Sequence, residues 1–452
     1  MKRIYKLFLT VICLCALLVN LVACNVGNNS NNNNNNNNNT NNGDSTQPDD
    51  TKTPTDPIED VIKSEEFQTM VKSANAFSYN LAAELYKSYE DADNFVVSPI
   101  SVYMALTLAA QCAAGETRDE ILEALGITYQ LLQNDFFSLY NSMNKEWYTY
   151  FDELEYKISL SNSIWKDDSA TVKDDCVAVL GDKFFCDVYS VDFAGDNEGA
   201  NQAIRNFIKE KTNNLIDQDF KISPTTLFTL INTLYLKDIW LKDGDDLPYA
   251  DGMYSFAGFD GEIKQTQLLR GYYSDGKVVE ADSYTHYYIR TQHGNKLKFL
   301  LPKDGYTVND IFTADNIKAV NAISDYGADD YETKTHYHTR CFFPEFQANY
   351  NKNVKEILQR RFGINKLFSL NCDFTTLTDN NVFCDTVQHV VKLNVDKKGI
   401  EGAAVTMITD AGMAGPDFWT DVYADFVVDR AFGFIITDRY DTTLFAGVVG
   451  NI

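Results

Sequence analysis

The amino-acid sequence predicts an α+β protein that is built around a large β-sheet. Helical and strand patterns follow one another from residue 58 to residue 452 without the regular strand–helix–strand alternation of a parallel sheet. One run, "TTLFTLINTLYLKDIW" at residues 225–240, is almost continuously apolar and consists mainly of strand-forming residues. Such a run is typical of a strand that is covered on both faces in the middle of a sheet. Because no second linker or internal repeat interrupts these patterns, we expect one large domain.

The first part of the domain is predicted to be mainly helical. Apolar side chains recur at helical spacing over residues 64–89, which indicates an amphipathic helix. A short strand is expected in "NFVVSPI" at residues 94–100. The residues that follow, 101–115, are apolar on nearly every face, as the residues of a buried helix are.

A further helix is predicted at residues 117–126, where Thr117 and Glu120 have capping-box spacing and Gly126 provides the end. The rest of the domain contains more strand patterns than helical ones. We expect helices at residues 203–213 and 353–363, and strands at residues 157–166, 225–240, 296–302, 339–347, 387–395, 425–438 and 442–452.

Residues 1–24 have the order of an export signal: three cationic side chains, an apolar core at residues 7–18 and a small residue before Cys24. The apolar core is too short and too close to the terminus for a membrane-spanning helix. The sequence at Cys24 is similar to a bacterial lipobox, which implies cleavage before this cysteine and lipid attached to it. An ordinary or uncleaved secretory signal is the alternative. We therefore expect an exported protein, at the cell surface or extracellular, that is anchored by lipid to a bacterial membrane.

Residues 25–57 consist of an asparagine tract followed by Ser, Thr, Asp and Pro. With almost no apolar side chain to bury, this segment cannot offset the entropy of ordering, so we expect a disordered tether. A low-complexity expansion without a function of its own would still act as a spacer. The predicted organisation is thus a signal at residues 1–24, a tether at residues 25–57 and a folded domain at residues 58–452.

The chain has a formal net charge of −25 at pH 7. The charges of the signal and of the tether cancel, so the folded domain carries this whole excess of acid. A surface of this sign argues against nucleic acids and other polyanions as partners.

The sequence contains no motif that identifies an enzyme. The nucleophile elbow G-x-S-x-G, the zinc motif H-E-x-x-H, the P-loop and the dinucleotide fingerprint are all missing. His336 and His338, with Cys341 close behind, could place two imidazoles on one strand face as metal ligands, but a solvated pair is the more common arrangement. We therefore expect neither catalysis nor a metal or cofactor.

Six cysteines remain outside the signal segment. An even number in an exported protein could form disulfides, but a domain of this size does not require them. Their spacing identifies no pairs among Cys112, Cys176, Cys186, Cys341, Cys372 and Cys384.

Four segments give the domain a specific resemblance to the serpin family, and together they cover its start, middle and end. The resemblance implies the serpin fold, with a large mixed β-sheet, further sheets, surrounding helices and an exposed reactive loop, and it implies a monomer. One departure is Ala431, which stands where the family usually has proline. The four segments are "NFVVSPISVYMALTLAA", "NTLYLKDIW", "QHVVKLNVDKKGIEGAAVT" and "DFVVDRAFGFIITDRYDTTLFAGVVGNI".

The resemblance places four residues in the shutter, the family's buried polar cluster beneath the centre of the main sheet: Ser98, Ser101, Asn232 and His389. Buried polar groups need hydrogen-bond partners, so such a cluster is stable in only a few arrangements and can gate separation of the strands above it. An ordinary satisfied polar core is the alternative reading of the same residues.

Trp240 matches the tryptophan of the breach, which is the upper opening of the main sheet in this family. There the family usually has an acidic residue at the start of the hinge and a lysine after a proline in the adjacent strand. This chain has Lys397 and Glu345 at those positions, so both charges are reversed. The swap predicts that Lys397 and Glu345 approach within salt-bridge distance.

The resemblance also implies a mechanism in which the loop is used once. A serine protease cuts the loop and forms an acyl-enzyme, and the freed segment inserts into the main sheet as a new strand before the acyl-enzyme is hydrolysed. With a period of two, Ile400, Gly402 and Ala404 would face inward as a mostly small, apolar set. Ile400 is larger than the family's usual Thr or Ser, which predicts slower insertion. The hinge is assigned to Lys397, Gly399, Ile400, Glu401, Gly402, Ala403 and Ala404.

The family's usual distance from the hinge places the scissile bond between Met413 and Ala414. Counting backward from "VVDRAFGF" gives a later point, so this loop is extended relative to the family. Met413 suits a protease with an apolar pocket of medium size, of the elastase, chymotrypsin or subtilisin type. Two alternatives stay open: a non-inhibitory serpin that acts as a surface binding protein, and an inhibitor of cysteine proteases.

Overall fold

The computed structural model describes residues 64–91, 93–148, 154–218, 221–241, 246–384, 386–401 and 419–452. The described residues belong to one compact unit, and they combine helices with several sheets. The predicted α+β class and the large sheet are therefore confirmed. Within the described residues, no helix combines the length and the apolar character that crossing a bilayer requires.

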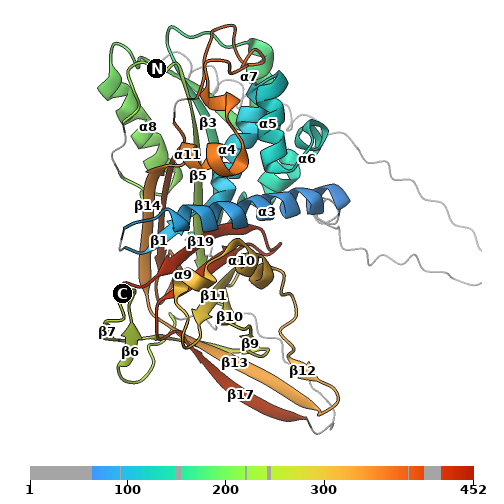
Figure 1. Ribbon diagram of the computed structural model, residues 1–452, viewed down its shortest axis with the longest axis vertical. Coiled ribbons are helices and arrows are strands. Elements are labelled where there is room, and N and C mark those ends of the chain that lie inside the picture. Colours follow the sequence, from blue (N-terminus) through green and yellow to red (C-terminus); the bar gives the residue numbers. More distant parts are fainter. Residues whose placement is uncertain are drawn as a thin grey trace, which may run out of the picture. The chain divides into compact units, whose positions relative to one another are not determined.

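The central sheet has seven strands, in the order β14–β15–β16–β5–β3–β2, with β4 paired parallel to β3. Its strands β14, β5 and β3 are labelled in Figure 1. The long apolar run of residues 225–240 forms β5 in its middle, as predicted. The strands are β2 (Lys145–Tyr148), β3 (Leu154–Asp167), β4 (Cys186–Val191), β5 (Phe228–Ile239), β14 (Phe346–Asn353), β15 (Gln388–Val395) and β16 (Gly399–Ile400).

The central sheet is not continuous. Antiparallel pairing with β3 runs along β5 from Phe228 to Lys237, but within the described part of the chain the other edge of β5 pairs only with the two residues of β16. β15 likewise pairs with β16 only at Val395. Among the residues that the structure describes, no strand lies between β5 and β15 below β16. For this reason residues 228–232 are only half-buried, and the expectation that this strand is covered throughout was wrong for its first half.

The second sheet has six strands in the order β1–β19–β18–β11–β10–β9 and lies in the hydrophobic core. Every residue of β18 and β19 is buried, which explains why the sequence there is apolar on both faces. The strands are β1 (Phe95–Val97), β9 (Val279–Glu280), β10 (Tyr284–Arg290), β11 (Lys296–Pro302), β18 (Phe432–Thr437) and β19 (Thr443–Val449).

The third sheet is a ribbon in which β13 pairs with β12, β17 and β8. β13 and β17 run parallel and side by side over eight residue pairs, from Thr335 with Thr420 to Phe342 with Val427 (Figure 1). A small hairpin, β6 with β7, completes the sheets. The strands are β6 (Tyr254–Ala257), β7 (Ile263–Thr266), β8 (Leu269–Asp275), β12 (Asp329–Asp330), β13 (Thr335–Phe343) and β17 (Thr420–Val427).

The helices cover the sheets, and the expected ones are present. The amphipathic helix α3 begins after Ser64, whose side chain accepts a hydrogen bond from the Phe67 backbone N–H at 3.0 Å. Thirteen of the fourteen residues of α4 are buried, as predicted for residues 101–115. The helices are α3 (Glu65–Lys87), α4 (Pro99–Cys112), α5 (Gly115–Leu125), α6 (Tyr129–Ser142), α7 (Asp174–Phe184), α8 (Asn197–Lys211), α9 (Val308–Ile311), α10 (Ala314–Asn321), α11 (Lys355–Phe362) and the short 3₁₀ helix η2 (Lys366–Phe368).

The predicted capping box of α5 is wrong, although Gly126 does end the helix in the left-handed conformation at φ 67°. The helix begins two residues before Thr117, whose hydroxyl accepts instead from the backbone N–H of Asp373 at 2.9 Å. The Glu120 carboxylate accepts from the backbone N–H groups of Asn365 and Lys366 at 2.8 and 2.7 Å. Both side chains therefore tie α5 to the segment after α11.

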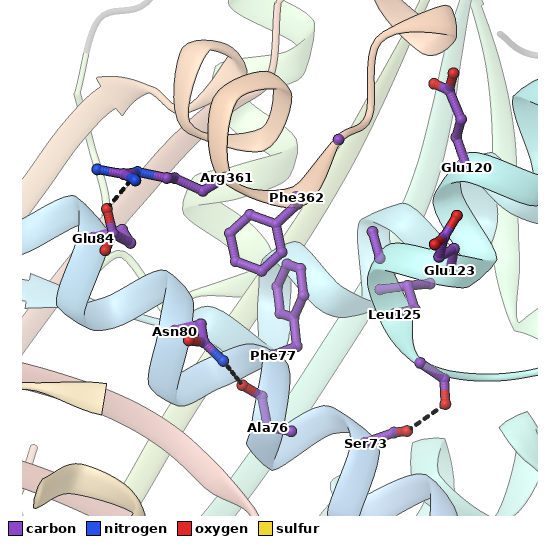
Figure 2. Close-up of a pocket in the computed structure, with 13 residues that line it drawn as sticks. Ser73, Ala76, Phe77, Asn80, Glu84, Glu120, Glu123, Leu125, Arg361 and Phe362 are labelled. Carbon is purple, nitrogen blue, oxygen red and sulfur yellow. Dashed lines mark hydrogen bonds and ion pairs between the residues drawn. The ribbon is translucent and has the colours of Figure 1, made fainter. Parts of the chain in front are cut away.

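A cavity of about 570 Å³ lies between α3, α5 and the end of α11 (Figure 2). Its floor is the ring pair Phe77 and Phe362, with centroids 4.7 Å apart, and its rim carries an ion pair of 2.7 Å between Glu84 and Arg361. Glu120, on the opposite side, accepts hydrogen bonds from backbone N–H groups. The carboxylates of Glu84 and Glu120 therefore hold neighbouring helices together, and we interpret the cavity as a space left between packed helices.

Gly447 provides a test of this core. A Cβ atom there would lie 2.3 Å from the Phe95 carbonyl oxygen and 2.6 Å from the Phe434 ring. Gly447→Ala should lower the free energy of unfolding by about 1–3 kcal/mol, because the packed strands must separate to admit a methyl group. Gly181→Ala is the control, since Gly181 lies in α7 and no packed neighbour comes within 4 Å of the new Cβ. This substitution should stabilise the protein by up to about 1 kcal/mol. Urea unfolding followed by circular dichroism measures both, and equal midpoints would contradict the described packing.

Candidate functional site: the gap in the central sheet

The gap between β5 and β15 contains a cavity of about 350 Å³. Residues from β5 form one wall, and Gln388 and Val390 of β15 form part of the other. The side chains of Ile208 and Ile216, from α8 and the segment after it, also line the space. The cavity therefore occupies the position that an additional strand would fill.

Three of the four predicted shutter residues meet beneath the β15 side of this gap. The Ser98 backbone N–H donates to His389 Nε2 at 3.0 Å, and the Ser98 hydroxyl donates to the Leu444 carbonyl at 2.9 Å. The hydroxyl oxygens of Ser98 and Ser101 are 3.0 Å apart. This network joins β15 to the start of α4 and to the buried strand β19.

His389 is held in its neutral form. Its ring is buried, and burial lowers the pKa of His389 from the ordinary 6.5 to about 3. Nε2 accepts the hydrogen bond from Ser98, so the ring proton resides on Nδ1.

Asn232, the fourth predicted shutter residue, lies on the other side of the gap. Its Nδ2 donates to Asn162 Oδ1 on β3 at 2.7 Å, and its own Oδ1 is buried with no hydrogen-bond partner among the described residues. The expected cluster is thus divided into one group on the β15 side and one on the β5 side. Sequence reasoning missed Asn162. The only sign of it in the sequence was a polar residue on the otherwise apolar face of the alternating pattern that forms β3.

The chain turns back from β15 into β16 through a tight turn at the top of the gap. Asp396 and Gly399 exchange backbone hydrogen bonds of 3.0 and 3.2 Å, and Asp396 Oδ1 accepts from the Lys398 backbone N–H at 2.7 Å. Trp240 is buried at the end of β5 and donates from Nε1 to the Asp396 carbonyl at 2.8 Å. Trp240 therefore holds the turn, which is consistent with its predicted place in the breach.

The expected ion pair between Lys397 and Glu345 does not form. Lys397 Nζ lies 3.0 Å from Asp246 Oδ2, whereas Glu345 Oε1 accepts from the Lys397 backbone N–H at 2.9 Å. The pKa of Lys397 is raised, mainly by its hydrogen bond to the Asp246 carboxylate. Lys397 and Glu345 thus both bind at the turn, but Lys397 pairs with the Asp246 carboxylate and Glu345 binds the Lys397 backbone N–H. Sequence reasoning missed Asp246, because its segment is acidic throughout.

Gly399 fits its place because no side chain could. Its φ is 157°, and a Cβ atom would lie 2.1 Å from the Asp238 carbonyl oxygen. The Asp238 carboxylate is fully buried and accepts from His293 Nδ1 at 2.8 Å and from Asn295 Nδ2 at 2.6 Å. These contacts fix the end of β5 on which β16 lies, and sequence reasoning did not identify them.

Beyond Gly399 the chain has begun to enter the sheet. The Ile400 side chain is fully buried, as expected of an inward-facing position, and Ile400 pairs with Asp238 and Val395. Glu401 follows with a φ of 60°, a left-handed conformation that is rare for a residue other than glycine. Its carboxyl group lies against the Tyr235 hydroxyl, and burial raises the pKa of Glu401 to about 7.

The remaining predicted positions lie outside the described residues: Cys24 of the lipobox, Gly402, Ala403 and Ala404 of the hinge, and Met413 and Ala414 of the reactive bond.

The alternative metal site is not formed. His336 Nδ1 lies 2.6 Å from Asp329 and His338 Nδ1 lies 3.0 Å from Asp275, while the Cys341 thiol is buried against the Tyr288 carbonyl. Over the described parts of the chain, no group of three potential ligands is placed to hold a metal ion. The six cysteines outside the signal segment are free thiols in the structure.

The open sheet, the short β16 and the buried polar network define a protein whose main sheet can accept another strand. The family model "Serpin (serine protease inhibitor)" matches residues 72–452, and the chain belongs to this family. Serpins are generally protease inhibitors of the suicide-substrate type rather than enzymes.

Known relatives agree with this assignment. Iripin-1 of Ixodes ricinus is 27% identical over 380 residues, which cover 80% of this chain and 89% of that protein. Human neuroserpin is 25% identical over 390 residues, covering 82% and 89%. Among solved structures, the thermophilic serpin tengpin in its native state has a TM-score of 0.66 at 21% identity and covers 86% of this chain and 95% of its own. Serpin48 of the insect Tenebrio molitor has a TM-score of 0.69 at 20% identity, covering 86% and 100%.

The buried histidine of the shutter predicts how stability depends on pH. In the unfolded chain His389 gains a proton as the pH falls below about 6.5, whereas in the folded protein it stays neutral down to about pH 3. The folded state therefore loses stability as the pH falls through this window, at up to about 1.4 kcal/mol per pH unit from this residue. His286, whose pKa burial lowers to about 4, adds to the same trend.

Comparison of the parent with His389→Asn isolates the contribution of the shutter histidine. Urea midpoints measured between pH 6.5 and pH 4.5 should fall less steeply in the variant, because His286 and the carboxyl groups are common to both proteins. Parallel curves would show that His389 is not the buried neutral group described here.

Proposed function

We propose that this protein is a single-use inhibitor of serine proteases of the elastase, chymotrypsin or subtilisin type. Its reactive bond is Met413–Ala414, and cutting this bond frees the segment that starts at Gly402 to extend β16 between β5 and β15. The observation that carries the proposal is the gap between these strands, at whose top Gly399 and Ile400 already form the first two residues of the missing strand.

The energetics favour insertion after the cut. Each inserted residue adds ladder hydrogen bonds worth about 1 kcal/mol net and buries its inward side chain. About a dozen residues separate Ile400 from Met413, so the total far exceeds the cost of distorting an acyl-enzyme. Before the cut, the segment is joined at both ends and cannot fill the gap completely. The intact fold is therefore a kinetic trap.

A non-inhibitory serpin that acts as a binding protein is the second candidate, and Glu401 is the observation that favours it. Its left-handed backbone must become extended, and its half-buried carboxyl group must leave Tyr235, before insertion can continue. The size of Ile400 does not favour this alternative, because the structure already accommodates its side chain inside the sheet. Inhibition of a cysteine protease through the same trap is a further outcome that the experiment below can distinguish.

We propose the location on separate grounds, namely the signal-like residues 1–24 and the asparagine-rich residues 25–57. The family match begins only at residue 72, so this part of the chain is supported by its sequence alone. A lipid on Cys24 would hold the domain at the surface of a bacterial membrane.

The trap predicts a covalent complex. The domain from residue 58 onward should give, with elastase-like and subtilisin-like enzymes, a band that survives boiling in detergent, together with a fragment that begins at Ala414. A cysteine protease of the papain type tests the cross-class alternative in the same gel. Cleavage of the loop by every enzyme without a stable complex would contradict the inhibitor and favour the non-inhibitory reading.

Ile400→Arg should convert the inhibitor into a substrate. The guanidinium group would have to be buried beside the Asp238 carboxylate, which already accepts from His293 and Asn295, so insertion becomes unfavourable and the acyl-enzyme is hydrolysed. We expect the number of inhibitor molecules cleaved per protease trapped to rise by roughly tenfold or more, because each 1.4 kcal/mol is a factor of ten. Ile263→Arg is the matched control, since Ile263 lies on β7 with 64% of its surface exposed. Titration of residual protease activity measures both variants, and unchanged stoichiometry in Ile400→Arg would contradict the assigned hinge.

A further inference from the structure

The ribbon of β8, β13 and β17 gathers aromatic and charged side chains on one face. In the parallel pairing of β13 with β17, His336 is opposite Asp421 and His338 is opposite Tyr423. Alternate residues of a strand share a face, so these four side chains lie together. We call this surface the ribbon face; its ring-bearing members are Trp419, His336, His338, Tyr423 and Tyr273.

The rings of the ribbon face form a continuous row. Trp419 stacks on His336 with centroids 4.3 Å apart, and His338 stacks on Tyr423 at 5.0 Å. The two histidine rings are 6.4 Å apart, and Tyr423 meets the edge of Tyr273 at 4.9 Å. The row therefore begins at the residue that follows the loop and continues along the ribbon toward β8.

This row lies outside the hydrophobic core and is open to solvent. Tyr423 is 58% exposed and Tyr273 is 42% exposed, and all six residues from Thr420 to Asp425 are exposed. Large aromatic side chains that gather on an accessible surface mark interaction sites, where they bury much area at a low entropic cost.

The ribbon is also acidic. Residues 272–277, 329–340 and 419–427 carry six carboxylates and only three lysine or arginine side chains. His338 lies between two of the carboxylates, with Nδ1 3.0 Å from Asp275 and Nε2 3.3 Å from Asp421. The side chains of Asp275 and Asp421 are 75% and 53% exposed, so their charge reaches solvent. A partner surface that complements this face is basic.

The ribbon face is continuous in sequence with the reactive loop. Trp419 lies six positions after Met413, so their Cα atoms are at most roughly 20 Å apart. A protein that binds through about 800 Å² of its surface covers a patch roughly 30 Å across. A protease whose active site holds Met413 therefore presents the surface beside its active-site cleft to the Trp419 end of the ribbon face.

We propose that the ribbon face is a second contact surface for the target protease, and that it selects enzymes with a basic surface beside the active-site cleft. This inference rests on the proposed function. The aromatic row supplies the area that such an interface buries, and the excess of carboxylates supplies its charge complementarity. Because the rings of Trp419 and His336 cover each other, they offer no flat platform for a sugar, and a protein partner fits the row better.

Binding without trapping tests the surface independently of inhibition. Elastase-like proteases with the catalytic serine replaced by alanine cannot form the acyl-enzyme, so their affinity for the intact domain reports only the initial contact. For an enzyme with a basic surface, Tyr423→Ala should weaken this affinity by about tenfold, as expected of an exposed aromatic residue that becomes buried at an interface. Asp421→Lys should weaken it as well and should reduce its dependence on salt. An acidic enzyme of the same specificity should show no loss with Asp421→Lys.

Trp147→Ala is the matched control, because Trp147 is 62% exposed on β2, away from the ribbon, and its replacement should leave the affinity unchanged. A peptide with the sequence of residues 400–420 should be cut by the active basic and acidic enzymes at similar rates. Equal affinities of the parent, Tyr423→Ala and Asp421→Lys would overturn the proposal even if detergent-stable complexes form. If such complexes are missing but these affinities differ, the ribbon contact stands and the inhibitory function fails.

Sedimentation of the isolated domain addresses the other possible occupant of the ribbon face. A monomer whose sedimentation is unchanged by Tyr423→Ala is expected. A dimer that Tyr423→Ala dissociates would overturn the proposal by assigning the ribbon face to a second copy of this chain.

Discussion

The structure depends on two strands of the central sheet that face each other without pairing. β5 and β15 each pair along one edge, with β3 and β14, and on the other edge the described residues join them only through the two residues of β16. Unpaired strand edges inside a sheet are unfavourable, because their backbone groups lack ladder partners and adjacent apolar side chains remain half-buried. A segment that can fill this gap gains both kinds of interaction, and this gain in free energy is the driving force of the proposed inhibition.

In the proposed mechanism, the hinge controls when the gap is filled. Trp240 and Glu345 hold the turn at residues 396–399, and Gly399 lies too close to the Asp238 carbonyl for any side chain. Ile400 is already inside the sheet, whereas Glu401 turns the chain away in a left-handed conformation. Below the hinge, the divided polar cluster holds the β15 side through His389 and the β5 side through Asn232, with no hydrogen bond between them among the described residues. The polar groups thus stabilise each side of the gap separately and do not hold the gap closed.

Much of this fold could be predicted from the sequence, because its strands and its buried helix have strong apolar patterns, as in β5, β19 and α4. Glycines beside strand-forming residues after Val395 also predicted a segment with two conformations, and this stays a prediction because most of that segment lies outside the described residues. Contacts between distant segments could not be predicted. Thr117 and Glu120 accept hydrogen bonds from backbone N–H groups some 250 residues away in sequence. These tertiary contacts replace the local capping box that their spacing predicted. Asp246 could not be distinguished from its acidic neighbours, and helices α6, α7 and α10 were not predicted, although Thr128 and Thr313 cap the starts of α6 and α10.

The most direct test of the central claim compares the thermal stability of the intact domain with that of the same domain after a single cut in the loop. If the freed segment becomes a strand between β5 and β15, about a dozen new ladder positions at about 1 kcal/mol each should raise the melting temperature by at least roughly 10 °C. Circular dichroism during heating measures this shift, with the cut verified by mass. A melting temperature that does not change after the cut would contradict the account, because the gap would then have no segment that fills it.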